Sequence, residues 1–555
     1  MKRFRVAAVM AVMLTLALTL SQAAVQAAPA RTIIPKNSKF RPLVTSEVRS
    51  GRGDQTGLQD SKTPSKFECR VSGDPSANVL MDCDGLSPNN EPNIAVDPAN
   101  RNHMVASSND YQSCCDEWYT SFNGGATWKT GNISVEAPGK KRRTGSDPVT
   151  TFDVKHGVVI HASLNYQNDG CDGDVVVSIS HDGGIHWNTV VEAVDAGGPT
   201  QCESNGVFND KEWITTDNNP ASPFYGRVYL TWTAFHSVNG TTTRSPIAEA
   251  HSDDGGITWA APHEISGSDP ALCTFQAGGG AAGPCDEDQF SVPTVAPDGT
   301  VYVSFINEQN MALWESGEVF DDQYLVVRSS DGGETWSAPT MIAGLEDGSR
   351  DFPINVSGRQ TLTNYQVRAP ITGNLVADPT HNGRLYFVFF DNRNGVHDVA
   401  NPVTNTDVFM VTSTDGGSTW SSPTRVNAAD SGAGNDQWFP WVDVDPSSGI
   451  VGVAYNDRSY DPTHDTYGAT LSESPGGGSS FTSQQVSTAA SHPRESVFFD
   501  AGTAAPGCET CARFNGDYIG LAYGSNGKAN VVWTDMRDLY APLGLYLQFV
   551  DFAQR

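Results

Sequence analysis

Three arginines follow strand-like runs of the sequence, and each lies within two residues of an aspartate. They occur in Asp391-Asn392-Arg393, Asn456-Asp457-Arg458 and Asp535-Met536-Arg537. A guanidinium binds a carboxylate through two parallel hydrogen bonds, so three of them around one ligand would form a strong carboxylate clamp. The alternative is structural, because each arginine could pair with its own or a neighbouring aspartate. The sequence leaves both interpretations open.

One eight-residue pattern, Ser-x-Asp-x-Gly-x-Thr-Trp, recurs along the chain. Perfect copies begin at Ser252, Ser329 and Ser413, and altered copies begin at Ser121, Ser180 and Ser474. Asp and Ser oxygens accept hydrogen bonds from nearby backbone N–H groups, glycine permits positive φ, and tryptophan packs on an apolar surface. Strand-like runs precede the pattern at 174–180, 323–329 and 406–413. The pattern therefore predicts a hairpin turn within each repeated unit.

These repeats resemble the Asp boxes of the sialidase-like, or BNR-repeat, superfamily, and the resemblance extends from about residue 90 to 550. It implies an all-β fold, a single β-propeller in which each Asp box joins the third and fourth strands of a blade. In that superfamily the boxes lie on the rim opposite the ligand. The resemblance thus assigns the repeated aspartates to the scaffold rather than to catalysis.

Seven units each begin with an acidic or amide cluster followed by an extended run, which predicts seven blades, with six as the alternative. The starts are 90–96, 146–149, 209–214, 288–290, 365–368, 435–438 and 515–518. The last unit, 515–553, has three strand-like runs and no Asp box. A strand from residues 67–82 is expected to complete it and close the ring. The predicted domains are a signal peptide (1–30), a flexible lead-in (31–65) and the propeller (66–555).

The N-terminus predicts export from the cell. Lys2, Arg3 and Arg5 precede an uncharged apolar run at 6–20, and small residues follow as far as Ala30, as in a cleaved signal peptide. No later run approaches the ~20 apolar residues of a membrane span. We therefore predict a secreted protein without a membrane span.

Charge and cysteine content agree with a secreted protein. The net charge of −29 repels phosphate backbones and anionic lipid, which excludes nucleic acid and membrane surfaces as expected partners. All ten cysteines follow the signal segment, and an even number in an exported protein favours disulfides over thiol catalysis. The close pairs are Cys69/Cys83, Cys171/Cys202 and Cys273/Cys285.

The resemblance also implies that loops entering the first strand of each blade and leaving the second share one face around a central channel. The entry loops carry Glu91, Asp147, Asp210, Glu212, Asp288, Asp436 and Asp517, and the exit loops carry the three arginines. Sialidases hold the substrate carboxylate with three arginines and attack with a tyrosine, helped by a glutamate and an acid/base aspartate. By this resemblance the predicted catalytic residues are Tyr518, Tyr455, Asp457 and Asp535.

The predicted substrate-binding residues are Arg393, Arg458, Arg537 and Arg368. Arg368 is included because Val367-Arg368-Ala369-Pro370 is the nearest echo of the Phe/Tyr-Arg-Ile/Leu-Pro motif of sialidases. In sialidases that motif lies in the first blade, whereas here it lies in the fifth unit. The departure leaves the roles of individual residues to be decided by the structure.

The expected function is that of a secreted sialidase-like glycoside hydrolase, of exo-α-sialidase type, acting on extracellular glycans or glycoproteins. One alternative is a non-catalytic propeller that binds a glycan or protein. Another is a different propeller enzyme, an arabinanase or a lyase, the lyase using His161, His236 or His397 beside a tyrosine. No cofactor or catalytic metal is predicted. At 168–174, oxygen ligands alternate with glycines, which suggests either a structural Ca²⁺ site or a plain acidic turn.

Overall fold

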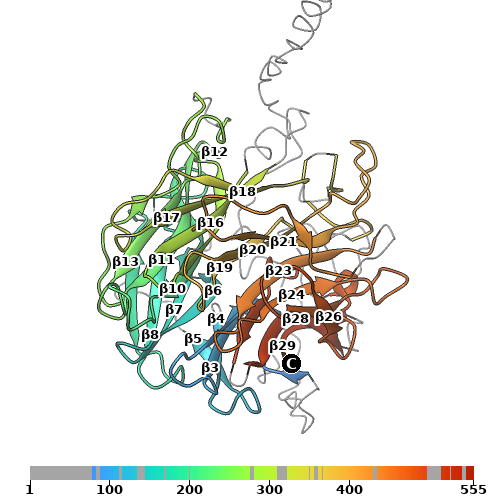
Figure 1. Cartoon of the computed structure of the whole chain (residues 1–555), viewed down its shortest axis with the longest axis horizontal. Coiled ribbons are helices and arrows are strands. Elements are labelled where there is room, and N and C mark those ends of the chain that lie inside the picture. The colour runs from blue at the N-terminus through green and yellow to red at the C-terminus, as the bar shows by residue number, and fades with distance from the viewer. Residues whose placement is uncertain are drawn as a thin grey trace, which may run out of the picture.

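A computed structural model describes most of the chain between residues 78 and 555. The described ranges are 78–82, 88–111, 116–133, 144–167, 170–198, 200–274, 281–308, 322–348, 350–354, 360–365, 367–428, 434–496, 514–524, 527–540 and 545–555. In these residues the strands form seven antiparallel sheets. Figure 1 shows the sheets following one another around the molecule in chain order. The predicted signal peptide and lead-in lie outside the described residues.

Each sheet is one blade, whose strands follow one another from the channel outward. Blade 1 contains β2 (Asn89–Val96), β3 (Met104–Asp110), β4 (Asp116–Ser121) and β5 (Lys129–Ile133). Blade 2 contains β6 (Thr144–Asp153), β7 (Val158–Tyr166), β8 (Asp174–Ser180) and β9 (Thr189–Val194). Blade 3 contains β10 (Gly206–Thr216), β11 (Val228–Val238), β13 (Ile247–Ser252) and β14 (His263–Glu264), and β12 (Thr241–Arg244) pairs with β11.

The later blades repeat this order. Blade 4 contains β15 (Asp288–Val295), β16 (Val301–Asn307), β17 (Gln323–Ser329) and β18 (Thr340–Gly344). Blade 5 contains β19 (Gly373–Ala377), β20 (Leu385–Asp391), β21 (Asp407–Ser413) and β22 (Thr424–Arg425). Blade 6 contains β23 (Gln437–Val444), β24 (Val451–Asp457), β25 (Gly468–Ser474) and β26 (Thr482–Gln485), and a short 3₁₀ helix, η2 (Pro493–Glu495), follows it.

Blade 7 closes the ring as predicted. Its strands are β27 (Gly520–Tyr523), β28 (Ala529–Tyr540), β29 (Leu545–Gln554) and the N-terminal β1 (Val79–Leu80). In the pairing of β1 with β29, Val79 lies opposite Phe552. The first strands contact one another around the ring, β27 against β2 included. The prediction of a seven-bladed propeller closed by an N-terminal strand is therefore confirmed.

The eight-residue repeats form hairpin turns, as their composition predicts. These turns join the third and fourth strands of a blade, as the resemblance implies. In the copy that begins at Ser329, the Ser329 hydroxyl accepts a hydrogen bond from the Gly333 N–H at 2.9 Å, and Gly333 has φ 97°. Asp331 accepts hydrogen bonds from the Thr335 N–H at 2.9 Å and the Thr335 hydroxyl at 2.6 Å. These bonds lower the pKa of Asp331 to about 2. The carboxylate is thus committed to holding the turn.

The core lies between neighbouring sheets, because the middle strands are buried on both faces. β20 is apolar from Leu385 to Phe390, and Phe387 packs on Phe389 of the same strand and on Tyr324 of blade 4. Strands buried on both faces show such unbroken apolar runs rather than alternation. The fifth blade begins later than expected, at β19, because Arg368 pairs with Thr361 in an isolated bridge before the first strand.

Two of the three predicted close disulfides are formed, Cys171–Cys202 and Cys273–Cys285. The third pair, Cys69/Cys83, and the remaining cysteines lie outside the described residues. Within the described part of the chain, no helix has the length and apolar character needed to cross a bilayer.

Candidate active site

The strand register places the entry loops opposite the repeated turns. In blade 1, Asn89 at the start of β2 lies opposite Asp110 at the end of β3, whereas Ser121, which opens the turn, lies opposite Met104. First strands therefore begin, and second strands end, on one face of the ring. We call it the entry face.

Five first strands carry a β-bulge near the entry face, and the bulged residue is not glycine. The residues and their φ angles are Glu91 (56°), Asp147 (58°), Lys211 (52°), Phe290 (53°) and Phe439 (54°). Left-handed backbone costs a non-glycine residue about 1–2 kcal/mol, and a bulge turns a side chain in a new direction. The bulge thus recurs in the fold, and in blades 1 to 3 the residue that it reorients is ionisable.

These side chains belong to a group of six charged residues that we call the channel cluster, each at most 3% exposed. Its members are Glu91, Asp147, Lys211, Glu212, Arg368 and Asp517. Arg368 donates to both carboxylate oxygens of Asp517, and the Nε–Oδ1 distance is 3.0 Å. The Asp517 N–H donates to Glu91 at 3.0 Å. The cluster therefore joins blades 1, 2, 3 and 7 to the segment before blade 5.

The two glutamates of the channel cluster hold protons strongly. Burial, followed by the negative charges of Asp147 and Asp517, raises the pKa of Glu91 well above its ordinary value. Burial and the charge of Asp147 do the same for Glu212. Glu91 accepts a hydrogen bond from Asn109 at 2.7 Å, whereas both carboxylate oxygens of Glu212 are buried without a hydrogen-bond partner in the described structure. Glu212 is thus a buried acid whose protonated form is favoured and whose carboxyl oxygens have no hydrogen-bond partner among the described residues.

Lys211 is held by aromatic rings rather than by hydrogen bonds. Its Nζ lies 4.1 Å from the ring centroid of Trp213 and 4.0 Å from that of Tyr518, and has no hydrogen-bond acceptor among the described residues. Cation–π contacts of this kind stabilise a desolvated ammonium by about 2 kcal/mol. Burial lowers the pKa of Lys211, although Asp147 and Glu91 act in the opposite direction. Its donors remain available to an acceptor on a ligand.

Of the four predicted catalytic residues, Tyr518 alone lies against the channel cluster. Its ring packs edge-on against Trp213 at 5.3 Å, and burial together with Glu91 raises its pKa well above 10.0. Tyr455 is a core residue bonded to Ser472 at 2.9 Å. Asp457 accepts hydrogen bonds from Gln437, Thr470 and Ser459, and Asp535 accepts them from Trp533 and Arg537.

The four predicted substrate-binding arginines are all paired with aspartates. Arg393 binds Asp391, Arg458 binds Asp436, Arg537 binds Asp535 and Asp551, and Arg368 binds Asp517. Arg458 is fully buried, and its guanidinium also stacks on Tyr365 at 3.9 Å. Arg393, Arg458 and Arg537 thus form the ion pairs that the sequence offered as the structural alternative to a clamp. To bind one substrate carboxylate together, they would have to give up these aspartate partners.

We expect Arg458→Ala to lower the free energy of unfolding by about 3–5 kcal/mol, because Asp436 would be left as an uncompensated buried charge. Chemical denaturation measures this effect. Arg494→Ala is the control, since Arg494 and Asp465 form an exposed pair at 2.6 Å that contributes about 0–1 kcal/mol. Loss of acidic-sugar turnover at unchanged stability would instead support the clamp.

The three histidines considered for a lyase are also paired with acids. His161 Nε2 lies 3.0 Å from Asp116, and both side chains are fully buried. His236 lies 3.9 Å from Glu264, and His397 hydrogen-bonds Asp351. Asp116 also contributes to the raised pKa of Glu212, so it belongs to the surroundings of the channel cluster.

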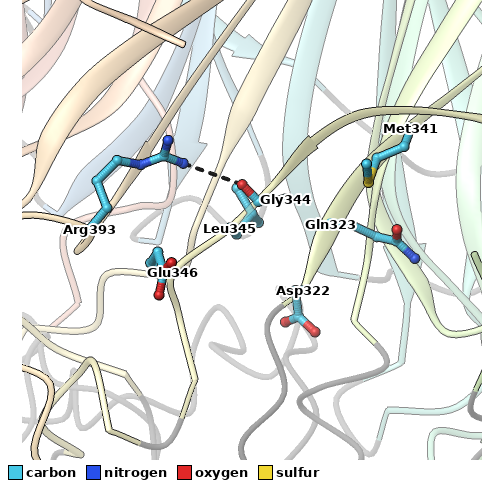
Figure 2. A pocket seen from close by; sticks show the side chains of 7 residues that line it. All are labelled: Asp322, Gln323, Met341, Gly344, Leu345, Glu346 and Arg393. Carbon is cyan, nitrogen blue, oxygen red and sulfur yellow. Dashed lines mark hydrogen bonds between the residues drawn. The ribbon is translucent and has the colours of Figure 1, made fainter. Parts of the chain in front are cut away.

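A pocket of about 440 Å³ lies between blades 4 and 5, and none of its lining residues belongs to the channel cluster. It is lined by Asp322, Gln323, Met341, Gly344, Leu345, Glu346 and Arg393. Figure 2 shows Arg393 reaching the Gly344 carbonyl, at 3.3 Å, beside Glu346. Arg393 is thus on a pocket wall, but its hydrogen bonds go to Asp391 and to this carbonyl.

The sequence predicts that four of the six channel-cluster residues lie on the entry face: Glu91, Asp147, Glu212 and Asp517. The motif around Arg368 indicates a fifth, whereas Lys211 is not among the predicted site residues. A functional role for Lys211 is indicated by Asn209-Asp210-Lys211-Glu212, where three charges interrupt a strand that continues as Trp213-Ile214. A buried strand rarely carries three consecutive charges without a functional or paired role.

Comparisons with known proteins identify related architectures. Neither a protein-family model nor a curated protein matches the sequence. Among solved structures, the chain is similar to the Hadza microbial sialidase Hz136, with 15% identity, TM-score 0.40 and coverage of 81% of this chain and 76% of that one. It is also similar to an α-L-arabinanase from Penicillium chrysogenum, with 14% identity, TM-score 0.41 and coverage of 71% and 94%.

A third similar structure is the intramolecular trans-sialidase from Ruminococcus gnavus, with 12% identity, TM-score 0.41 and coverage of 88% of this chain and 98% of that one. At these identities, the reaction has to be inferred from the side chains of this chain.

Proposed function

We propose that the protein is a glycoside hydrolase and that the channel cluster is its catalytic centre. The observation that carries the proposal is Glu212, a fully buried carboxyl group with a raised pKa and two carboxyl oxygens without hydrogen-bond partners among the described residues, beside Asp147 and Lys211. A glycosidase needs one carboxyl group that stays protonated and a second that is charged. A structural carboxylate would be hydrogen-bonded or ion-paired, as Asp517 is.

The arrangement suggests the following chemistry. Glu212, whose raised pKa favours the protonated form, donates its proton to the glycosidic oxygen while the bond to the anomeric carbon breaks. The carboxylate of Asp147, whose charge makes the largest charge contribution to the raised pKa of Glu212, stabilises the positive charge that develops on the sugar ring. Water adds to the anomeric carbon and its proton returns to the carboxyl pair. The products are a sugar with a free anomeric hydroxyl and the released alcohol.

Lys211 supports an acidic sugar as the substrate. Its ammonium is desolvated and has no acceptor in the described structure, so a sugar carboxylate would gain a strong charge-assisted hydrogen bond there. Arg368 is less suited to this role because Asp517 occupies its guanidinium. In this proposal the clamp predicted for three arginines is replaced by one lysine.

The second candidate is an exo-α-sialidase in which Tyr518 attacks the anomeric carbon. Tyr518 is the predicted tyrosine that lies against Lys211, and Glu91, Asp147 and Glu212 all act on its pKa. Because these charges and burial raise that pKa, the attack would require transfer of the phenol proton to a neighbouring carboxylate. In this candidate the roles of Glu212 and Lys211 are unchanged.

We propose extracellular glycans or glycoproteins as the setting. The two disulfides support folding in an oxidising compartment.

The test is release of sugar by the purified protein from an aryl sialoside and from neutral and uronic acid-containing polysaccharides. We expect turnover of an acidic substrate. Release of a neutral sugar alone would support hydrolase activity but would reject the proposal that Lys211 binds the carboxylate of an acidic sugar. Absence of turnover by folded protein on every substrate would reject the hydrolase in favour of a propeller that only binds its partner.

A further inference from the structure

We propose that Glu346, Asp351 and His397 form a binding site for a divalent transition-metal ion. Glu346 and Asp351 lie between β18 of blade 4 and β19 of blade 5, and His397 lies between β20 and β21. The site shares no residue with the channel cluster, so it stands apart from the proposed hydrolase activity.

The three side chains already place their donor atoms close to one another. One donor atom from each of the three side chains lies within 4.8 Å of the others. Donor atoms on one ion, each about 2 Å from the metal, lie up to about 4 Å apart. Small rotations of the side chains would therefore bring all three donor atoms within bonding distance of one ion.

Asp351 supplies an independent indication of a ligand. Its side chain is fully buried, and Oδ1 is hydrogen-bonded to His397 Nδ1. Oδ2 is also buried and has no hydrogen-bond partner among the described residues. A buried carboxylate oxygen without a partner costs free energy unless a cation or donor binds it. The imidazole beside it is a common metal ligand.

The backbone holds the two ligand-bearing segments together. The Asn392 N–H donates to the Glu346 carbonyl at 3.2 Å, and the Asn392 side chain donates to the Asp351 carbonyl. The Asp398 N–H donates to the Arg350 carbonyl at 2.9 Å, next to both ligands in sequence. The Glu346 N–H donates to Asp391 at 3.1 Å. Metal ligands fixed by such outer contacts lose little freedom on binding.

The donor set selects the metal. Ca²⁺ and Mg²⁺ prefer oxygen ligands alone, and Ca²⁺ takes six to eight of them. One imidazole and two carboxylates suit Zn²⁺ and similar ions, and three protein ligands leave coordination positions open. His397 is 32% exposed, which gives the ion a path from solvent. Glu346 also lines the pocket between blades 4 and 5 (Figure 2), so an open position would face bound water or an oxygen-bearing ligand there.

The test is equilibrium dialysis of the full chain, without a polyhistidine tag, against ZnCl₂, with bound zinc measured by mass spectrometry. We expect the wild-type protein to bind one more Zn²⁺ per chain than His397→Ala or Glu346→Gln, and its melting temperature to rise with Zn²⁺ only when both residues are present. Circular dichroism establishes whether each variant is folded. Two variants are used so that the second still tests the proposal if the first fails to fold.

The control is His186→Ala. His186 contacts Asp182 at 2.6 Å on an exposed turn, so it reproduces a His–Asp pair without a third ligand. It should bind as much zinc as the wild type. Equal zinc in the wild type, His397→Ala and Glu346→Gln would overturn the proposal. Binding of Ca²⁺ that depends on Asp351 but not on His397 would also overturn it.

Discussion

Glu212→Gln is expected to reduce glycoside hydrolysis about 10²–10⁴-fold while the propeller stays folded, because an amide of nearly the same shape cannot donate the required proton. The loss should fall on kcat, since the substitution keeps the packing around residue 212. Steady-state kinetics on the substrate identified in the panel measure the change. Unchanged kcat would remove Glu212 from the mechanism.

The same variant should alter the dependence of stability on pH. The pKa of Glu212 is raised in the folded protein, so between the ordinary value of 4.5 and the folded value the folded state binds more protons than the unfolded state. Stability then falls as pH rises through this window. We expect the wild type to be more stable near pH 5 than at pH 8, and Glu212→Gln to weaken that dependence. Glu91, Glu249 and other buried acids whose pKa is also raised contribute to the part that remains.

Glu249→Gln is the matched control for the kinetic measurement. Glu249 is a buried glutamate in β13 of the same blade, and burial raises its pKa as well. It contacts His251 at 3.3 Å and does not belong to the channel cluster. Its replacement should change the pH dependence of stability and leave kcat unaltered. Equal loss of kcat in both variants would mean that Glu212 acts through stability.

Arg368→Met is expected to lower the free energy of unfolding by about 3–5 kcal/mol. The Arg368–Asp517 pair joins residues 149 positions apart, and both side chains are fully buried. Removing the guanidinium leaves the Asp517 carboxylate without its counter-charge. Because Asp517 also donates its N–H to Glu91, the change should disturb the channel cluster as well.

A double-mutant cycle with Asp517→Asn tests this interpretation by chemical denaturation. The double variant should be more stable than the sum of the two single effects predicts, because the second change removes the uncompensated carboxylate. Arg227→Met is the control, since Arg227 binds Asp253 with the same two-bond geometry at 2.8 and 2.7 Å, but Asp253 is 63% exposed. It should lose less stability than Arg368→Met, because the exposed Asp253 stays solvated when its partner is removed. Additive effects of Arg368→Met and Asp517→Asn would refute the coupling.

The sequence by itself determined the architecture, because the features that build it are local. In the copy that begins at Ser329 the turn is made by a serine, an aspartate and a glycine within five residues, so its hydrogen bonds follow from spacing alone. The strands before the turns are short apolar runs, and those predicted at 174–180 and 323–329 coincide with β8 and β17. Two cysteine pairs close in sequence formed the disulfides expected of them.

Only the tertiary structure decided the site. Strand alternation places Lys211 and Glu212 on opposite faces, whereas the bulge at Lys211 breaks that alternation, and both residues are subject to the charge of Asp147. The choice between a clamp and ion pairs for Arg458 depended on the position of Asp436, in the neighbouring strand's entry loop. The channel cluster and the proposed metal site both contain residues from separate segments. Such contacts depend on closure of the propeller ring and on side-chain rotamers, and a short segment of sequence determines neither.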